Sequence, residues 1–420
     1  MKTSLIALAW LAAVLATPVA AQKIDPASDL GRFHALRAEG MAALQKNDRQ
    51  TALDRLRQAG DILPDSPSVL LLKAQTALEL KRQPAARAAL IDYLKRGLVL
   101  DLSRYPEFNT LWDADLESLQ AANTARVGSL KTLNRLSGLN LIEGVAALPD
   151  GALLATSLRN GLVGPLSEAG VAKRLSLRAG VAANAIAVKD GVLWASTAAS
   201  RQTVGYAPDA KIASKLVKVD LATGKILEQF EDKRPDRRLA ELYAGKEDLY
   251  VSDGNTGEVL RLTGYQGRLQ VLIPEGYLGS PQGLSENAEA SVLIVSDYAS
   301  GLYRVDLAKG ALTRLKAPEE TVLLGIDGLY RYGNDLIAVQ NGFKPNRILR
   351  LRMNPDWSAV EKAEVLLRGH PDLEEPTGGQ VIGDRFVFVA RSQWSEFDDK
   401  GNIRRDVPAP VVIGEIALKP

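Results

Sequence analysis

The feature that most limits the fold of this chain is a strand–turn–strand repeat in its last two thirds. The clearest copy covers residues 325–342, where a short strand, a Gly-Asn-Asp turn and a second apolar strand follow one another. Six copies can be laid out, and each opens with a polar residue; the six opening residues, called hub residues below, are Glu143, Asn184, Glu241, Gln282, Asp327 and Thr377. Their spacings of 41, 57, 41, 45 and 50 residues suit four-stranded blades. The repeat therefore predicts a mainly β fold, a six-bladed β-propeller over residues 126–420.

The last repeat is one strand short. The run at residues 130–136, just before the first repeat, can supply the missing strand and close the ring. Closure of this kind removes the exposed sheet edges that an open array would carry. A β-sandwich or an open β array is the structural alternative.

The segment before the propeller has helical spacing and is rich in Ala, Leu, Arg and Gln. A period of 34 residues relates Leu36 to Leu70 and Ala52 to Ala86, and Pro64 ends the first pair of helices. This small and large pattern resembles tetratricopeptide repeats, and it predicts a helical module at residues 22–125. The alternative is an ordinary helical hairpin with a coincidental period. In either case we expect a docking or packing module without chemistry.

The N-terminus predicts secretion. Residues 1–21 combine Lys2, an apolar run and small residues before Gln22, which is typical of a signal peptide. The apolar run is shorter than the roughly 20 residues that a membrane span needs, so we expect a periplasmic or secreted protein without an integral span after cleavage. A net charge of +2 gives no indication of nucleic-acid binding.

The composition restricts the chemistry that a site can use. The chain has no cysteine and two histidines, which excludes disulfides, thiolate nucleophiles and histidine-rich metal sites. In a propeller the hub residues converge at one end of the central channel. Carboxylate and amide oxygens gathered there suit a hard divalent cation such as calcium, which would also relieve the repulsion between clustered acids.

At the hub residues the chain resembles the senescence marker protein/gluconolactonase family, whose relatives include lactonases and arylesterases. Three segments carry the resemblance: Glu143-Gly144 with the Pro-Asp-Gly turn at 149–151, Ser280-Pro281-Gln282-Gly283-Leu284, and Ile326-Asp327-Gly328-Leu329. The resemblance implies that Glu143, Gln282 and Asp327 are metal ligands. It also implies that Asp327 is the general base and that Asn184 contacts substrate or metal.

One ligand position departs from the family. The family has an asparagine where this chain has Gln282, whose extra methylene moves the amide oxygen outward by about one bond length. We assign Glu241, the remaining acid of the hub, to substrate binding. Arg391 and Trp394, after the last apolar strand, are expected to cover the channel and bind a ring or carboxylate; packing of a long loop is the alternative.

Two functions follow from these patterns. The first is a metal-dependent lactone or ester hydrolase with the cation at the channel mouth, acting on a small molecule. The alternative is a non-catalytic binding or scaffold propeller of the cell envelope, which docks a protein partner through the helical repeats.

Overall fold

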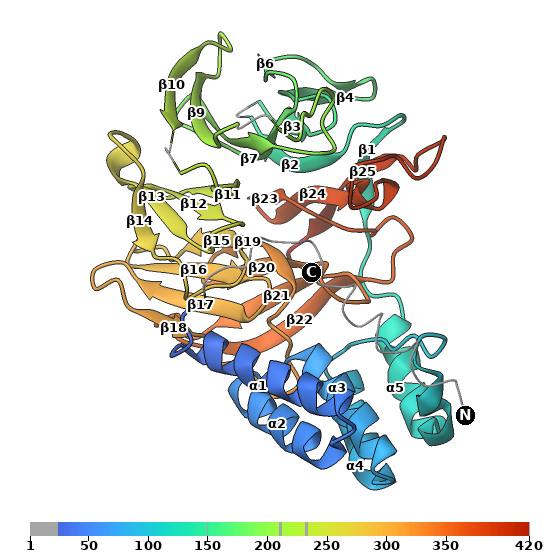
Figure 1. The fold of residues 1–420 in the computed structure, drawn as a ribbon. Helices are drawn as coiled ribbons and strands as arrows, with labels where there is room; N and C mark the ends of the chain where they lie inside the picture. Colours follow the sequence, from blue (N-terminus) through green and yellow to red (C-terminus); the bar gives the residue numbers. More distant parts are fainter. Residues whose placement is uncertain (1–23, 149, 210–211, 232–233, 420) are drawn as a thin grey trace. The chain divides into compact units, whose positions relative to one another are not determined.

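The computed structural model describes residues 24–148, 150–209, 212–231 and 234–419. The predicted signal peptide and Pro149 of the first repeat lie outside the described residues. The chain divides into a helical unit that ends at Asn123 and a propeller that begins at Thr124 (Figure 1), and each is described by itself.

The helical unit consists of two helical hairpins and a terminal helix, which confirms the predicted helical segment. Its elements are, in order, α1 (Asp29–Gln45), α2 (Arg49–Ile62), α3 (Pro67–Glu79), α4 (Gln83–Lys95), the 3-10 helix η2 (Pro106–Leu111) and α5 (Ala114–Thr124). Ser28 caps α1 by accepting a hydrogen bond from the Gly31 amide. Small residues allow the helices to approach closely: Ala52 and Ala86 are fully buried, and a Cβ on Gly40 would lie 3.1 Å from the Leu56 side chain.

The propeller has six antiparallel sheets, numbered here as blades 1 to 6 along the chain. Blades 1 to 3 consist of β2 (Ile142–Ala147), β3 (Leu153–Ser157), β4 (Leu162–Ser167), β5 (Gly170–Val171) and β6 (Leu175–Ser176); then β7 (Val181–Lys189), β8 (Val192–Ala199), β9 (Lys215–Asp220) and β10 (Ile226–Glu231); then β11 (Leu239–Ala244), β12 (Leu249–Asp253), β13 (Val259–Leu262) and β14 (Gln270–Ile273). Blades 4 to 6 consist of β15 (Pro281–Glu286), β16 (Val292–Asp297), β17 (Gly301–Asp306) and β18 (Leu312–Arg314); then β19 (Ile326–Tyr332), β20 (Asp335–Gln340), β21 (Arg347–Met353) and β22 (Val360–Arg368); then β23 (Gly379–Ile382), β24 (Arg385–Arg391), β25 (Val411–Ala417) and β1 (Lys131–Leu136). The predicted six-bladed propeller is confirmed.

Blade 6 is built from both ends of the propeller sequence. β1 pairs antiparallel with β25, with Lys131 opposite Glu415 and Leu136 opposite Val411. Lys131 also forms an ion pair with Glu415 at 2.8 Å. The strand at residues 130–136 therefore closes the ring as predicted, and a run near the start of the domain pairs with the last strand of the chain.

The core is divided among the blades. One apolar cluster fills each contact between neighbouring blades, six in all among the described residues. Between blades 4 and 5, for example, Leu302, Leu336 and Trp357 are buried together. Each buried leucine of this kind contributes about 1.5–3 kcal/mol, so the ring is held by contacts between blades and needs no disulfide. None of the helices in the described part of the chain is long and apolar enough to cross a membrane.

Candidate functional site

The innermost strands of blades 1 to 5 share one irregularity, and it lies at the hub residue. In each of these blades the pairing register between the first and second strands shifts; the shifts lie between Ile142 and Val145, Ala183 and Ala185, Leu239 and Leu242, Pro281 and Leu284, and Ile326 and Gly328. A β-bulge of this kind turns a side chain away from its regular direction. The register shift therefore turns the side chain of each of the five hub residues in a direction that it would not take in a regularly paired strand.

Hydroxyl groups on the second strands bind the backbone amides that the bulges free from the sheet. Thr156 Oγ1 accepts hydrogen bonds from the amides of Gly144, at 3.0 Å, and Glu143, at 3.3 Å. In blade 3, Ser252 Oγ accepts from the Glu241 amide at 3.1 Å. These hydrogen bonds satisfy backbone N–H donors that the irregular pairing would otherwise leave without a partner.

The three acidic hub residues lie on alternate blades, the first, third and fifth, and their carboxyl groups interact. Burial, followed by the Asp327 carboxylate, raises the pKa of Glu241 to about 8. Burial and then Asp327 also raise the pKa of Glu143 well above its usual range, and Glu241 adds to this shift. Burial raises the pKa of Asp327 to about 6. The structure thus brings together three acids that are far apart in the sequence.

Neutral donors orient two of the three carboxyl groups. Trp394 Nε1 donates to Glu143 Oε2 at 2.6 Å, and Asn341 Nδ2 donates to Asp327 Oδ2 at 2.9 Å. Tyr298 in turn donates its hydroxyl hydrogen to Asn341 Oδ1 at 3.0 Å. Within the described residues, Oε1 of Glu143 and Oδ1 of Asp327 accept no hydrogen bond. Each of these two groups therefore keeps one oxygen for a ligand.

The hub residues of blades 2, 4 and 6 use their side chains differently. Asn184 Nδ2 donates to the Leu239 carbonyl of blade 3 at 2.6 Å, and Thr377 Oγ1 donates to the Glu143 carbonyl of blade 1 at 2.8 Å. Gln282 Nε2 donates to Ser280 Oγ of its own blade at 3.1 Å. Two of these three residues thus join neighbouring blades, and Asn184, predicted to contact substrate or metal, holds the backbone of blade 3.

The acids do not form a metal centre made of carboxylates alone. No group of three or more carboxylate or imidazole side chains in the described residues lies close enough to hold a metal ion. The predicted ligands Glu143, Gln282 and Asp327 come from blades 1, 4 and 5. A cation among them would be held by two carboxylates and by amide oxygens.

The two residues predicted to cover the channel lie in different surroundings. Trp394 contacts the Glu143 carboxyl group, as described above. Arg391 Nη2 donates to the Pro371 carbonyl at 2.8 Å, and its guanidinium lies 3.4 Å from Asp372 and 3.3 Å from Glu374. Arg391 thus holds the 371–374 segment of its own blade.

The loop that carries Trp394 is fixed by its neighbour Gln393. Gln393 Oε1 accepts from the amides of Asn140 and Leu141 at 2.9 Å, and Nε2 donates to the carbonyls of Gly138 and Ala409. Gln393 has a φ of 82° and Leu141 a φ of 48°, a region that residues other than glycine rarely adopt. This strained backbone, next to Glu143, positions the indole over the hub.

Sequence reasoning missed four residues at the hub. Arg238 is accessible to solvent but surrounded by enough protein that desolvation lowers its pKa, while Glu143 opposes that shift. The Tyr330 hydroxyl accepts a hydrogen bond from the Gly379 amide at 2.8 Å, and burial and then Glu241 raise its pKa. Tyr298 orients Asn341, as described above. Only Asn341 had a local signal, the Asn-Gly pair at the end of β20; the other three follow no pattern of their own.

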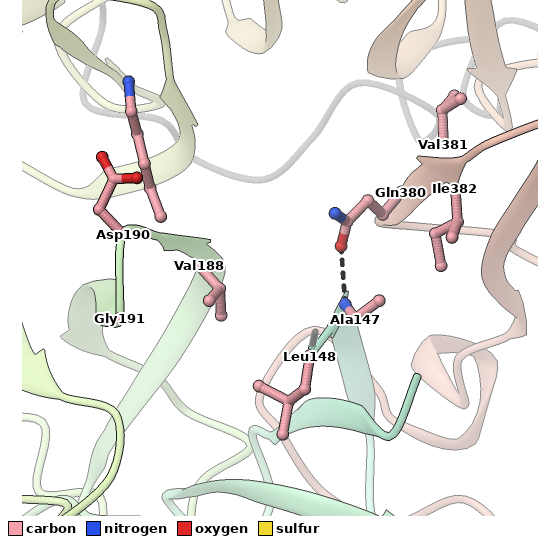
Figure 2. Close-up of a pocket in the computed structure, with 9 residues that line it drawn as sticks. Ala147, Leu148, Val188, Asp190, Gly191, Gln380, Val381 and Ile382 are labelled. Carbon is pink, nitrogen blue, oxygen red and sulfur yellow. Dashed lines mark hydrogen bonds between the residues drawn. The ribbon is translucent and has the colours of Figure 1, made fainter. Parts of the chain in front are cut away.

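A separate cavity of about 560 Å³ lies where the inner strands β2, β7 and β23 end. Its lining combines apolar side chains with Lys189, Asp190 and Gln380, and Gln380 Oε1 accepts from the Ala147 amide at 2.7 Å across it (Figure 2). Glu143 lies near the start of β2, whereas Ala147 is its last residue. The cavity is therefore at the opposite end of the inner strands from the acids and contains none of the hub residues.

Comparison with known proteins finds similar folds. No protein-family model matches the chain, and no curated protein sequence matches it significantly. Among solved structures, a PQQ-bound aldose sugar dehydrogenase from Streptomyces coelicolor is 15% identical and covers 69% of this chain and 98% of its own, with a TM-score of 0.43. A virginiamycin B lyase from Staphylococcus aureus is 17% identical, covering 62% and 81%, with a TM-score of 0.44. A luciferin-regenerating enzyme is 11% identical, covering 70% and 96%, with a TM-score of 0.46. The function therefore has to be argued from the residues of the site itself.

Proposed function

We propose that this protein hydrolyses a lactone or a related ester at the hub of its propeller. The observation that carries the proposal is the convergence of Glu143, Glu241 and Asp327 from alternate blades. The negative charge of Asp327 helps to raise the pKa of each of the two glutamates. Three acids in one mouth are costly for the fold, because like charges and burial both disfavour ionisation. Sites that tolerate this cost are commonly sites of proton transfer or cation binding.

A divalent cation, calcium as first choice, fits part of this donor set. Glu143 and Asp327 each have one carboxyl oxygen without a hydrogen bond, and Gln282 has an amide oxygen of the same kind among the described residues. Hard cations prefer oxygen ligands of these types. We propose that these three residues hold the cation, with backbone or water oxygens completing its coordination.

The chain's own residues supply the proton transfers. Asp327, oriented by Asn341 and Tyr298, accepts a proton from the attacking water, whose oxygen adds to the carbonyl carbon. The acyl carbon–oxygen bond then breaks, and Glu241 in its protonated form donates to the leaving alkoxide, which becomes a hydroxyl group. The protonated Asp327 then gives its proton up and Glu241 takes one back through solvent, which restores both residues, and one water is consumed per ester. The acid product ionises in water. A bound cation would polarise the substrate carbonyl and stabilise the developing negative charge.

Resemblance at the hub segments supports the same reaction class. The segments around Glu143, Gln282 and Asp327 resemble those of the gluconolactonase-type family, and the fold is of the type that the resemblance implies. Residues 1–21 support secretion to the periplasm or beyond. The mature chain would then work among small-molecule esters of the cell envelope.

A second candidate is a non-catalytic propeller that binds a partner in the envelope. Two observations favour it: among the residues that the structure describes, no three carboxylates are close enough to hold a metal ion, and a helical unit with its own buried core precedes the propeller. In that case the acids bind a structural ion or remain solvated, and the helical unit docks the partner.

Calcium calorimetry and hydrolysis assays on the mature chain separate the two candidates. We expect binding in the micromolar range, its loss in Asp327→Asn, and calcium-dependent hydrolysis of phenyl acetate or γ-butyrolactone that a chelator removes. Glu361→Gln, which removes an exposed carboxylate on β22, is the matched control and should behave as the parent. No calcium binding up to millimolar concentration would overturn the cation site, and hydrolysis indistinguishable from buffer would favour the binding propeller.

A further inference from the structure

Two adjacent arginines just before β11 have opposite surroundings. Arg237 is buried, and its guanidinium lies 2.8 Å from Glu258 and 3.6 Å from Asp253. Successive side chains of an extended segment point to opposite sides. Arg238 is accordingly exposed to solvent, and in the described residues no ion pair or hydrogen bond engages its guanidinium.

Arg238 lies at the same end of the inner strands as the acids, because it directly precedes Leu239, the first residue of β11, whose carbonyl accepts a hydrogen bond from the hub residue Asn184. The charges that act on it are Glu143 of blade 1 and two residues of the loop after β8, Arg201 and Tyr206. Arg201 has the same sign as Arg238, so it adds positive charge and gives no compensation. Glu143, the carboxyl group that acts on Arg238, already accepts a hydrogen bond from Trp394.

The backbone of Arg238 is held in place on both sides. Its amide donates to Asp253 Oδ1 at 3.0 Å, and its carbonyl accepts from the Gly254 amide at 3.1 Å. Asp253 Oδ1 also accepts from the amides of Asn255 and Thr256. The backbone of Arg238 is thus fixed by the end of β12, and binding an anion would not require the backbone to be ordered first.

An exposed guanidinium without a partner favours an anion, because a carboxylate can accept two parallel, charge-assisted hydrogen bonds from it. We propose that Arg238 is the anion-binding residue of the channel mouth and that it holds the carboxylate of a hydroxycarboxylate. This rests on the proposed function, because opening a lactone ring with water produces one hydroxyl and one carboxylate in the same molecule. Arg238 beside Glu143 would then receive the charge that the reaction creates.

The test measures product binding by calorimetry at low ionic strength, where screening is weakest. The probes are γ-hydroxybutyrate and ε-hydroxycaproate, with butanediol and hexanediol as uncharged analogues of the same lengths. The parent protein should bind at least one hydroxycarboxylate about tenfold more tightly than its diol. Arg238→Gln should remove that difference. Arg238→Lys should keep part of it, because lysine retains the charge without the planar pair of donors.

The control is Arg268→Gln, which removes an exposed arginine between β13 and β14 and should bind as the parent does. Equal carboxylate affinity in Arg238→Gln and the parent would overturn the proposal, as would no binding of either acid by the parent up to millimolar concentration. Circular dichroism of each variant checks that the propeller is folded. Because binding is measured without turnover, loss of carboxylate binding in Arg238→Gln supports the anion site even if no ester is hydrolysed. Hydrolysis with unchanged carboxylate binding would contradict only this inference.

Discussion

Blades 1, 3 and 5 place a carboxyl group at the hub, whereas blades 2, 4 and 6 place an amide or hydroxyl group there. The backbone is similar in blades 1 to 5, since the bulge occurs at Asn184 and Gln282 as it does at Glu143 and Asp327. The side chains nevertheless differ in use. Asn184 and Thr377 donate to carbonyl oxygens of the next blade, while the acids interact with one another across the channel.

Hydrogen-bond chemistry explains the difference. The neighbouring blade offers backbone carbonyl oxygens at this level, and these can only accept. Amides and hydroxyls can always donate to them, whereas a carboxyl group can donate only while it is protonated. The carboxyl groups of the acids therefore face the channel, where they can bind cations or protons and accept hydrogen bonds from donors such as Trp394 and Asn341. Replacing an acid by an amide at a hub position, or an amide by an acid, should thus change whether the side chain interacts in the channel or donates to the neighbouring blade.

The largest effect is expected when an acidic blade is given an amide. Asp327→Asn removes the base and one charged oxygen, and we expect kcat/KM for lactone or aryl ester hydrolysis to fall by about 100-fold or more. Thermal stability should be unchanged or slightly higher, because repulsion with Glu143 and Glu241 is removed. Full activity in this variant would contradict the role of Asp327, provided that Glu361→Gln is also active.

Placing an acid in a blade that has an amide at the hub should lower stability. Asn184→Asp replaces the donor to the Leu239 carbonyl with an acceptor and adds a fourth carboxyl group to the hub. We expect the free energy of unfolding to fall by about 1–3 kcal/mol, the usual cost of a buried polar group left without its partner, as measured by urea denaturation. Asn184→Ala serves as the comparison, and if it were less stable than Asn184→Asp, the inter-blade hydrogen bond would not be the reason.

The acids should also make stability depend on pH. Because the pKa of Glu241 rises from 4.5 to about 8 on folding, the folded state holds this proton more tightly than the unfolded chain. The free energy of unfolding should therefore decrease as pH rises through this interval. Glu241→Gln should make the decrease smaller in urea denaturation at a series of pH values. An unchanged slope in this variant would mean that Glu241 does not hold its proton in the folded protein.

The smallest effect is expected at Thr377. Thr377→Val removes one of two donors to the Glu143 carbonyl, and the Gly378 amide still donates to the same oxygen at 2.9 Å. We expect a loss of about 0.5–1.5 kcal/mol in the free energy of unfolding, below that of Asn184→Ala. A larger loss than in Asn184→Ala would contradict the view that the number of remaining donors decides the cost.

Much of the fold could be predicted from the sequence because its causes are local or periodic. Apolar alternation and turn residues mark each blade, the spacing of hub residues indicates the number of blades, and an unpaired run at residues 130–136 anticipates the closing strand. Asp253, the last residue of β12, likewise accepts hydrogen bonds from the amides of Asn255 and Thr256, which follow it directly in the chain. These features depend on neighbours in the chain.

The use of each hub side chain was decided by the tertiary structure. The sequence by itself determined that six polar residues would reach one end of a channel, including the three acids Glu143, Glu241 and Asp327. It did not determine that Asn184 and Thr377 would donate to the next blade, or that Arg238 would join the mouth from the start of blade 3. These outcomes depend on which atoms of a neighbouring blade lie within about 3 Å. That distance is set by the packing of six sheets around a ring, which no short segment of the chain records.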